Sequence, residues 1–419
     1  MSKILGIRGK NILGVNPPVH DFAFFDLWSK PMGLLYLLER MRLNGNDVFL
    51  LDTIYEAAAS EKTFGRKKIV GTEIEKPKIY KGIQRKYHHF GLGEDEIRAR
   101  LSETPQPDVI LLTSAMTYWY PGVQWMIAAL KEILPGVPVV LGGTYATLCT
   151  GHAATLGADF IVSGNWEPDV ARPAMDLYKN LSYGVTMTSF GCPLACEYCA
   201  SRVLWPHYRR RSVHEVLREI DFQVQLGARD FAFYDDALLM EKEDYFFPLC
   251  EALRKRYGNA LRFHTPNGLH VREIDEKCAA VLWETGFKTI RLSLESIDPK
   301  LAGSGKVVWR EYADAVANLK SAGYAKKELE TYILLGLPGQ VIDSVKETIS
   351  FVHASGGKPK LAEFSPIPHT PAFEEAAKAM PALRTEPLLQ NNSVYSSWIS
   401  QNITPQELQE LKDLARAVF

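Results

Sequence analysis

The stretch Gly191-Cys192-Pro193-Leu194-Ala195-Cys196-Glu197-Tyr198-Cys199 spaces its cysteines as Cys-x3-Cys-x2-Cys. It follows an apolar run, 185–189, that predicts a buried β-strand. Thiolates this close together can bind one metal centre. A zinc site would need a fourth ligand, for which His207 is the nearest candidate. An iron–sulfur cluster held by only three cysteines would keep one iron open to a substrate or cofactor.

Downstream of this stretch, apolar runs predict strands that alternate with helices. The strands are expected at 230–234, 261–264, 289–294, 330–335 and 362–364, and two of the helices at 213–225 and 273–284. Such alternation predicts a parallel sheet, and about 180 residues are too few for the eight units of a closed barrel. We therefore expect a partial (βα)6 barrel over 180–369, followed by a short helical tail, 370–419, with a final amphipathic helix at 405–418.

Upstream, the chain predicts a separate α/β domain over 1–179. Its strands are expected at 12–15, 48–51, 108–113, 137–141 and 160–162, with helices at 31–43 and 124–134. Uninterrupted apolar strands predict a doubly wound parallel sheet that is covered on both faces. A basic insert, about 54–105, separates the second strand from the third. We expect this insert to be a solvated surface excursion, with a lid or an anion contact as the alternative.

Composition excludes several classes of protein. The chain has 419 residues, 46% of them apolar, and 48 basic residues against 49 acidic ones give a net charge of −1. Neither a nucleic-acid partner nor a membrane partner is expected, because the net charge is near zero and no run of about 18 apolar residues occurs. Six cysteines are too sparse for a disulfide scaffold, and 1–14 has no signal pattern, so a cytoplasmic protein is expected. Cys250 and Cys278 are predicted to be core residues, and Cys149 stays open.

The cysteine spacing, with Tyr198 before the last cysteine, resembles the signature of radical S-adenosylmethionine (SAM) enzymes. The resemblance implies that Cys192, Cys196 and Cys199 hold three irons of a 4Fe–4S cluster. SAM would bind the fourth iron and be cleaved to methionine and a 5′-deoxyadenosyl radical. Such a reaction also implies an electron donor that reduces the cluster.

Motifs after the later strands resemble the SAM contacts of this family. They include Tyr234-Asp235-Asp236, Pro266-Asn267-Gly268 and Gly336-Leu337-Pro338-Gly339. Each has a plainer interpretation, since aspartates cap helices and glycines form turns. The cofactor contacts that the resemblance implies are Tyr198, Asp235, Asp236, Asn267, Arg291, Ser293, Glu295, Gly336 and Pro338.

The first domain resembles the cobalamin-binding domain that precedes many radical SAM barrels. The matching features include Gly142-Gly143 and the turn after the third strand. The residues expected to contact cobalamin are Ser114, Met116, Thr117, Gly142, Gly143 and Tyr145. The Asp-x-His-x-x-Gly motif that supplies a cobalt-ligating histidine in other cobalamin proteins is absent, and Tyr145 stands where many relatives have histidine.

These resemblances predict a cobalamin-dependent radical SAM methyltransferase that acts on an unactivated carbon of a small molecule or peptide. One alternative is a radical SAM enzyme that performs a ring closure or rearrangement without methyl transfer. Another is a non-catalytic iron–sulfur or zinc protein. The identity of the substrate does not follow from the sequence.

Overall fold

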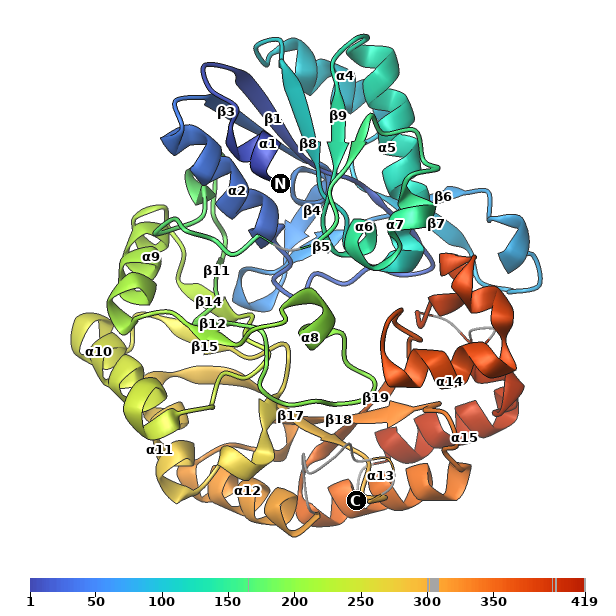
Figure 1. The fold of residues 1–419 in the computed structure, drawn as a ribbon. Helices are drawn as coiled ribbons and strands as arrows, with labels where there is room; N and C mark the ends of the chain where they lie inside the picture. The colour runs from blue at the N-terminus through green and yellow to red at the C-terminus, as the bar shows by residue number, and fades with distance from the viewer. Residues whose placement is uncertain (165, 300, 302–308, 394, 396–397, 418–419) are drawn as a thin grey trace. The chain divides into compact units, whose positions relative to one another are not determined.

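The computed structural model describes residues 1–164, 166–299, 301, 309–393, 395 and 398–417 (Figure 1). The chain divides into two compact units. One comprises Met1–Ser182 with Pro381–Val394, and the other Tyr183–Met380 with Tyr395–Phe419. None of the helices in the described part of the chain combines the length and the hydropathy needed to cross a membrane.

A five-stranded parallel sheet forms the centre of the first unit. In spatial order its strands are β10 (Phe160–Ile161), β9 (Val139–Leu141), β8 (Val109–Leu112), β1 (Asn11–Asn16) and β3 (Asp47–Asp52). This is the doubly wound arrangement that the apolar strands predict. The strand order reverses between β1 and β8, so the carboxyl ends of these two strands flank the topological switch point.

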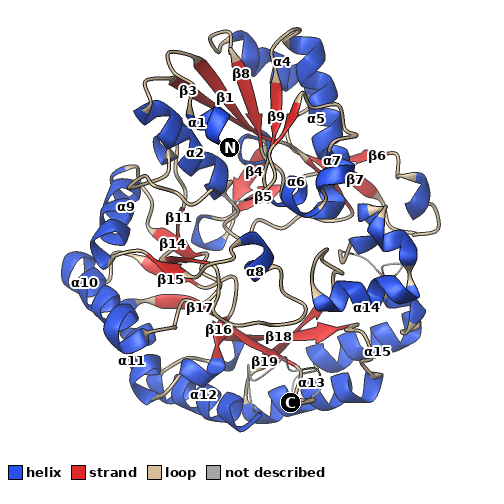
Figure 2. Ribbon diagram, in the orientation of Figure 1, coloured by secondary structure: helices blue, strands red, loops and turns tan. Residues whose placement is uncertain are grey.

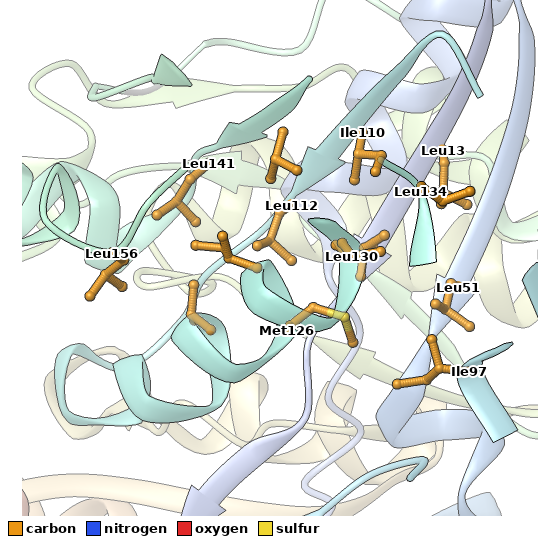
Figure 3. Close-up of a cluster of buried hydrophobic side chains, with 14 of the residues drawn as sticks. Leu13, Leu51, Ile97, Ile110, Leu112, Met126, Leu130, Leu134, Leu141 and Leu156 are labelled. Carbon is orange, nitrogen blue, oxygen red and sulfur yellow. The ribbon is translucent and has the colours of Figure 1, made fainter. Parts of the chain in front are cut away.

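Helices cover both faces of this sheet. Leu112 of β8 belongs to one buried cluster with Leu130 of α5 (Tyr120–Ile133), which Figure 3 shows in close-up. Its neighbour Leu111 belongs to a second cluster with Leu38 of α2 (Met32–Leu43). Consecutive strand residues point to opposite faces, so α2 and α5 lie on opposite sides of the sheet. The shorter helices of this unit are α1 (Ser2–Leu5), α3 (Thr53–Glu56), α4 (Glu94–Ser102), α6 (Thr144–Leu148) and α7 (Thr150–Ala153).

The basic insert is only partly the surface excursion that its charge predicts. Its strands β6 (Thr72–Ile74) and β7 (Tyr87–Phe90) form an antiparallel sheet with β2 (Val19–Asp21), and β4 (Ala58–Glu61) pairs with β5 (Lys67–Ile69). Tyr80 and Tyr87 are buried against Phe22, with ring centroids 5.0 and 5.1 Å away. The insert therefore supplies part of the core of the first unit.

A segment from the C-terminal part of the chain completes this core. It contains two short 3₁₀ helices, Pro381–Arg384 and Pro387–Gln390. Leu388 is buried in the cluster of Phe22, Tyr80 and Tyr87, and its carbonyl accepts a hydrogen bond of 2.8 Å from the Tyr80 hydroxyl. This segment therefore belongs to the first unit, although more than 180 residues of the second unit precede it in the sequence.

The second unit holds a parallel sheet that stays open, with helices along one side of it (Figure 2). In spatial order the strands are β11 (Gly184–Thr186), β14 (Asp230–Phe233), β15 (Arg262–His264), β17 (Phe287–Glu295), β18 (Leu329–Leu335) and β19 (Lys358–Glu363), and β16 (Leu269–His270) also pairs with β17. The intervening helices are α9 (Val213–Gln225), α10 (Phe247–Tyr257), α11 (Glu276–Thr285), α12 (Trp309–Ala322) and α13 (Ile342–Ser355). The predicted partial (βα)6 barrel is confirmed.

The outer face of the barrel sheet packs on the helices, and the inner face carries charge. The Thr331 hydroxyl of β18 lies 2.8 Å from the Tyr312 hydroxyl of α12, so Thr331 points outward. Its neighbour Glu330 therefore points inward. The parallel register aligns Arg291 of β17, Glu330 of β18 and Lys358 of β19 in one row across this inner face.

Two of the predicted strands differ from the structure by more than two residues at one end, whereas the others agree within two residues. The run 185–189 is divided between β11 and a short strand β12 (Ser189–Phe190), which pairs antiparallel with β13 (Arg209–Arg210). The strand expected at 362–364 already begins at Lys358. Its first three residues are two lysines and a proline, so they do not form the apolar run by which a strand is predicted. The tail contains α14 (Pro371–Ala379) and α15 (Pro405–Arg416).

Candidate cofactor sites

The three clustered cysteines lie on one loop of the second unit, between β12 and the short helix α8 (Ser201–Leu204). None of the three is part of a disulfide; Cys192 and Cys196 are partly exposed and Cys199 is exposed. The backbone N–H of Leu194 donates to Cys192 Sγ, and the backbone N–H of Ser201 donates to Cys199 Sγ. Each donor–acceptor distance is 3.4 Å. Such N–H donors are common partners of metal-bound thiolates and tune their charge.

This donor set fits an iron–sulfur cluster. Within the described part of the chain, no three His, Cys, Asp or Glu side chains stand close enough to share one metal ion. A four-iron cluster does not require that proximity, because each thiolate binds its own iron. Burial raises the pKa of the Cys192 thiol to about 11, so its proton must be displaced when a metal binds.

Asp236 fastens the end of the cysteine loop to the barrel. Its Oδ2 accepts a hydrogen bond of 2.5 Å from the hydroxyl of Ser201, two residues after Cys199. Burial raises the pKa of this carboxyl. The negative charge of Asp236 also contributes to the raised pKa of the Cys192 thiol, which places the two side chains near each other.

Asp235 has a different environment from its neighbour. Its carboxylate accepts hydrogen bonds from the Thr188 N–H and hydroxyl and from the Ser189 hydroxyl, at 2.5–3.0 Å. Thr188 lies on the connection between β11 and β12, and Ser189 is the first residue of β12. Asp235 therefore ties the end of β14 to the strand that leads into the cysteine loop, and its oxygens are turned toward protein donors.

The charge of Glu295, at the end of β17, acts on Tyr198 of the cysteine loop. Burial and, next, this charge raise the pKa of the Tyr198 hydroxyl. Glu295 is buried and has a φ of 65°, which is uncommon for a residue with a side chain. The register with β18 shifts between Ser293 and Glu295. A strained, buried carboxylate at a strand end is typical of functional sites.

Ser293 and Asn267 lie around the same strand ends. A Cβ atom on Gly268 would stand 2.4 Å from Ser293 Oγ, so the turn after β15 rests directly on Ser293. The Asn267 amide donates to the Tyr234 carbonyl over 3.0 Å, and its side chain is otherwise exposed. Arg291 lies nearer the amino end of β17 on the inner face, where it is ion-paired with Glu330. Of these candidates, Ser293 and Asn267 share the carboxyl edge with Glu295.

The turn after β18 is fixed by two residues that sequence analysis missed. The Gln340 amide oxygen accepts from the Gly336 N–H at 2.7 Å, and its amide nitrogen donates to the Leu334 carbonyl at 3.0 Å. The Trp398 indole N–H donates to the Gly336 carbonyl over 2.7 Å. Gly336 has a φ of 89°, and a Cβ there would stand 2.1 Å from the Ile399 side chain. Pro338 follows in the same turn and is partly exposed.

In the first unit, the turns after β8 and β9 are joined at the carboxyl edge of the sheet. The Ser114 hydroxyl donates to the Gly142 carbonyl over 2.6 Å. Gly143 has a φ of 95°, and a Cβ there would stand 2.4 Å from the Ser114 carbonyl oxygen, so only glycine allows this approach. Gly143 and Met116 are exposed, Met116 by 49%. Exposed backbone at this edge fits a large ligand lying against the strand ends.

Two predicted contacts of this edge are turned into the protein. Tyr145 is fully buried, and its hydroxyl lies 2.6 Å from His152 Nδ1. Thr117 is buried as well. In this conformation neither side chain reaches the exposed edge, which is left to Met116, Gly143 and the partly exposed Gly142, because Ser114 is itself buried.

The aromatic stretch after β8 is used for packing with 381–394. The Tyr118 hydroxyl donates to Asn392 Oδ1 over 2.8 Å, and the Tyr120 hydroxyl donates to Glu386 Oε1 over 3.2 Å. The Trp119 indole donates to Asp21 Oδ2 over 2.7 Å. These aromatic side chains therefore hold the first unit together.

Comparison with protein families finds a different family in each of the two units. The B12 binding domain matches residues 80–171, and the Radical SAM superfamily matches residues 186–352. The chain is a radical SAM protein with a B12-binding domain. Its cofactors are accordingly a 4Fe–4S cluster, S-adenosylmethionine and cobalamin.

This radical SAM protein is similar to curated proteins with different activities. An uncharacterized methyltransferase of Pyrococcus horikoshii is 29% identical over 42% of this chain and 38% of the relative. The anaerobic magnesium-protoporphyrin IX monomethyl ester cyclase of Rubrivivax gelatinosus is 24% identical over 68% of this chain and 61% of the relative. The chain thus spans less than two thirds of the length of either curated relative.

The fold of this radical SAM protein resembles that of a solved structure over most of its length. TsrM from Kitasatospora setae, a radical SAM methyltransferase solved with tryptophan substrate and a SAM analogue, superposes with a TM-score of 0.64. The match covers 88% of this chain and 76% of TsrM at 15% identity. At that identity the likeness concerns the fold.

Proposed function

We propose that this protein is an enzyme that reductively cleaves SAM and methylates an unactivated carbon of its substrate with the help of cobalamin. The observation that carries the proposal is the loop of Cys192, Cys196 and Cys199 at the first strand of a partial barrel, in a chain that also has a B12-binding domain.

The cysteine loop would hold the cluster through three irons. When bound, the cofactors supply an electron that cleaves SAM to a 5′-deoxyadenosyl radical, and a methyl group carried on cobalt. Asp235 and Asp236 hold the loop at both ends through Thr188, Ser189 and Ser201, so we assign them a positioning role.

The carboxyl edge of β17 and β18 would bind SAM. Glu295 offers a carboxylate next to the cysteine loop, and Ser293 offers a hydroxyl at the same edge. Gln340 and Trp398 hold the turn after β18 in place through the buried Gly336, and the partly exposed Pro338 of this turn would face SAM. A binding site built on fixed strand ends keeps the reacting groups in one orientation, which is the main contribution a protein makes to cofactor chemistry.

In the first unit, cobalamin would lie against the turns at Ser114–Met116 and Gly142–Gly143. Met116 and Gly143 are the exposed residues of these turns, and the hydrogen bond from the buried Ser114 to Gly142 fixes the turns to each other. Tyr145 is buried and hydrogen-bonded to His152, so its side chain would not bind the cobalt in this conformation. Retention of corrin absorbance after the full chain is loaded with hydroxocobalamin tests this site, and loss of all absorbance on desalting would contradict it.

The reaction itself is tested by SAM cleavage. Anaerobically reconstituted protein should contain about four irons per chain and form 5′-deoxyadenosine when reduced in the presence of SAM. Cys196→Ala should abolish both. Cys250→Ala is the matched control, because Cys250 is a fully buried core residue away from the loop, and it should keep its iron and its cleavage activity.

The similarity to a cyclase over 68% of this chain supports a second candidate, a ring closure without methyl transfer. The two candidates differ in the fate of the SAM methyl group. With SAM carrying an isotopic label on its methyl carbon, methylation transfers the label to cobalamin or product, whereas cyclisation leaves it in methionine.

A further inference from the structure

A cavity of about 560 Å³ lies beside the edge strand β19 of the second unit. Its volume is within the range of roughly 300–1,000 Å³ that small-molecule sites occupy. No aspartate or glutamate is found among the described residues that line it. Its lining includes six cationic side chains: Lys326, Lys327, Lys358, Lys360, Lys412 and Arg416. We call it the basic cavity.

Neighbouring carboxylates offset only part of this charge. Glu330 is shared by Lys358 at 2.8 Å, by Lys360 at 3.3 Å and by Arg291. Burial and the charge of Arg291 lower the pKa of Lys360. One carboxylate shared by three cations leaves an excess of positive charge on this side of the cavity.

On the other side of the cavity, Lys412 is paired with Glu363 at 3.2 Å and Arg416 with Asp413 at 3.9 Å. The C-terminal turns of α13 and α15 also end here and attract cations. Each helix end carries about −0.5 elementary charge, so two ends offset about one of the six cations. Together these groups leave the basic cavity with net positive charge.

The basic cavity is separate from the cofactor site of the same unit. Lys326 and Lys327 immediately precede β18, and Lys358 is the first residue of β19. These positions mark the amino edge of a parallel sheet, whereas the cysteine loop and Glu295 lie at the carboxyl edge. The charge of the basic cavity is therefore not explained by the binding of SAM or the cluster.

We infer that the basic cavity binds a small molecule that carries at least two negative charges on phosphate groups. Five of the six cations are lysines, whose ammonium groups bind phosphate oxygens as compact point charges, and only Arg416 has the planar fork that binds a carboxylate through two parallel hydrogen bonds. Pro359, Leu361 and Ala415 add apolar lining against which the uncharged part of such a ligand can pack. The inference does not depend on the proposed methylation.

Calorimetric titration of the full chain with inorganic pyrophosphate tests this inference. We expect saturable binding of one pyrophosphate per chain, and a loss of affinity of at least tenfold in Lys326→Gln/Lys327→Gln. These two side chains are at least partly exposed, so the variant should fold normally. The matched control is Lys255→Gln/Lys378→Gln, which removes the same charge from exposed sites elsewhere in the unit and should bind within twofold of wild type.

Three results would overturn the inference. The first is the absence of saturable binding by the wild-type chain. The second is an equal loss of affinity in both double variants, which would mean that pyrophosphate binding depends only on the net charge of the chain. The third is equally tight binding of citrate, which would mean that the cavity does not select phosphate over carboxylate.

Discussion

The hydroxyl of Ser201 donates a 2.5 Å hydrogen bond to Oδ2 of Asp236, and this bond joins the end of the cysteine loop to the end of strand β14. Two different elements position the two partners. Ser201 begins the short helix that follows Cys199, and Asp236 comes after a buried strand. The loop that would hold the cluster is thereby attached to the barrel wall.

Removing this bond should loosen the loop. In Ser201→Ala the buried Asp236 carboxylate loses its donor, which costs about 1–3 kcal/mol. We expect a lower iron content after reconstitution and faster loss of the cluster in air. Ser355→Ala, which removes a hydroxyl bonded only within α13, is the control and should keep wild-type iron. Unchanged cluster lifetime in Ser201→Ala would contradict the positioning role of Asp236.

Glu295→Gln tests the SAM site. The side chain keeps its size but loses its charge, and hydrogen bonds to charged groups contribute about 1.5–3 kcal/mol. We expect the KM for SAM to rise at least tenfold while the iron content stays the same. Glu251→Gln removes an exposed carboxylate from α10 and should leave the KM unchanged. If Glu295→Gln cleaves SAM with the wild-type KM, Glu295 is not a SAM contact.

Gly143→Ala should destabilise the first unit. The backbone there has a φ of 95° and a ψ of −170°, and the new Cβ would stand 2.4 Å from the Ser114 carbonyl oxygen. Such a conformation costs a residue with a side chain about 1–3 kcal/mol, apart from the clash. Gly151→Ala meets no atom within 4 Å and should change stability by about 1 kcal/mol or less. Equal unfolding midpoints for the two variants would contradict this account.

Buried Lys30 predicts a pH-dependent stability of the first unit. Its ammonium lies over the rings of Tyr55, at 3.0 Å, and Tyr178, at 3.8 Å, and it faces Asp26, Asp52 and Lys67. Burial lowers its pKa to about 7. Because an unfolded lysine titrates near 10.4, the unfolded chain binds more protons between these pH values, and stability rises with pH across this window.

Denaturant unfolding at pH 7 and pH 9 measures this effect. Wild type should gain stability relative to Lys30→Met by as much as about 1.4 kcal/mol per pH unit as pH rises. Stability rises with pH because the pKa of Lys30 is lower in the folded chain than in the unfolded chain. A constant difference between the two proteins across this range would show that Lys30 titrates normally.

The sequence predicts well those elements whose positions depend on neighbouring residues. Helix α9 has the predicted bounds, 213–225, because Ser212 and Glu215 form a capping box at its start. The cysteine loop is also local, since its spacing predicts a metal centre and resembles the radical SAM signature. The strands of both sheets could be found because buried parallel strands are continuous apolar runs.

Contacts between distant parts of the chain could not be predicted in this way. Trp398 fixes Gly336 from 62 residues away, and Leu388 packs on Tyr80 from 308 residues away. Tyr145 follows a glycine pair at a ligand edge, yet its apolar ring gains more from burial beside Tyr120 than from exposure at the edge. No local pattern indicates which side of a turn a side chain will take.

The products formed from SAM show whether this protein is a radical SAM enzyme. Anaerobic, reconstituted wild-type protein, reduced in the presence of SAM, should form 5′-deoxyadenosine, and Cys196→Ala under the same conditions should form none. A wild-type chain that binds about four irons and sulfides yet forms no 5′-deoxyadenosine with any reductant would contradict the account.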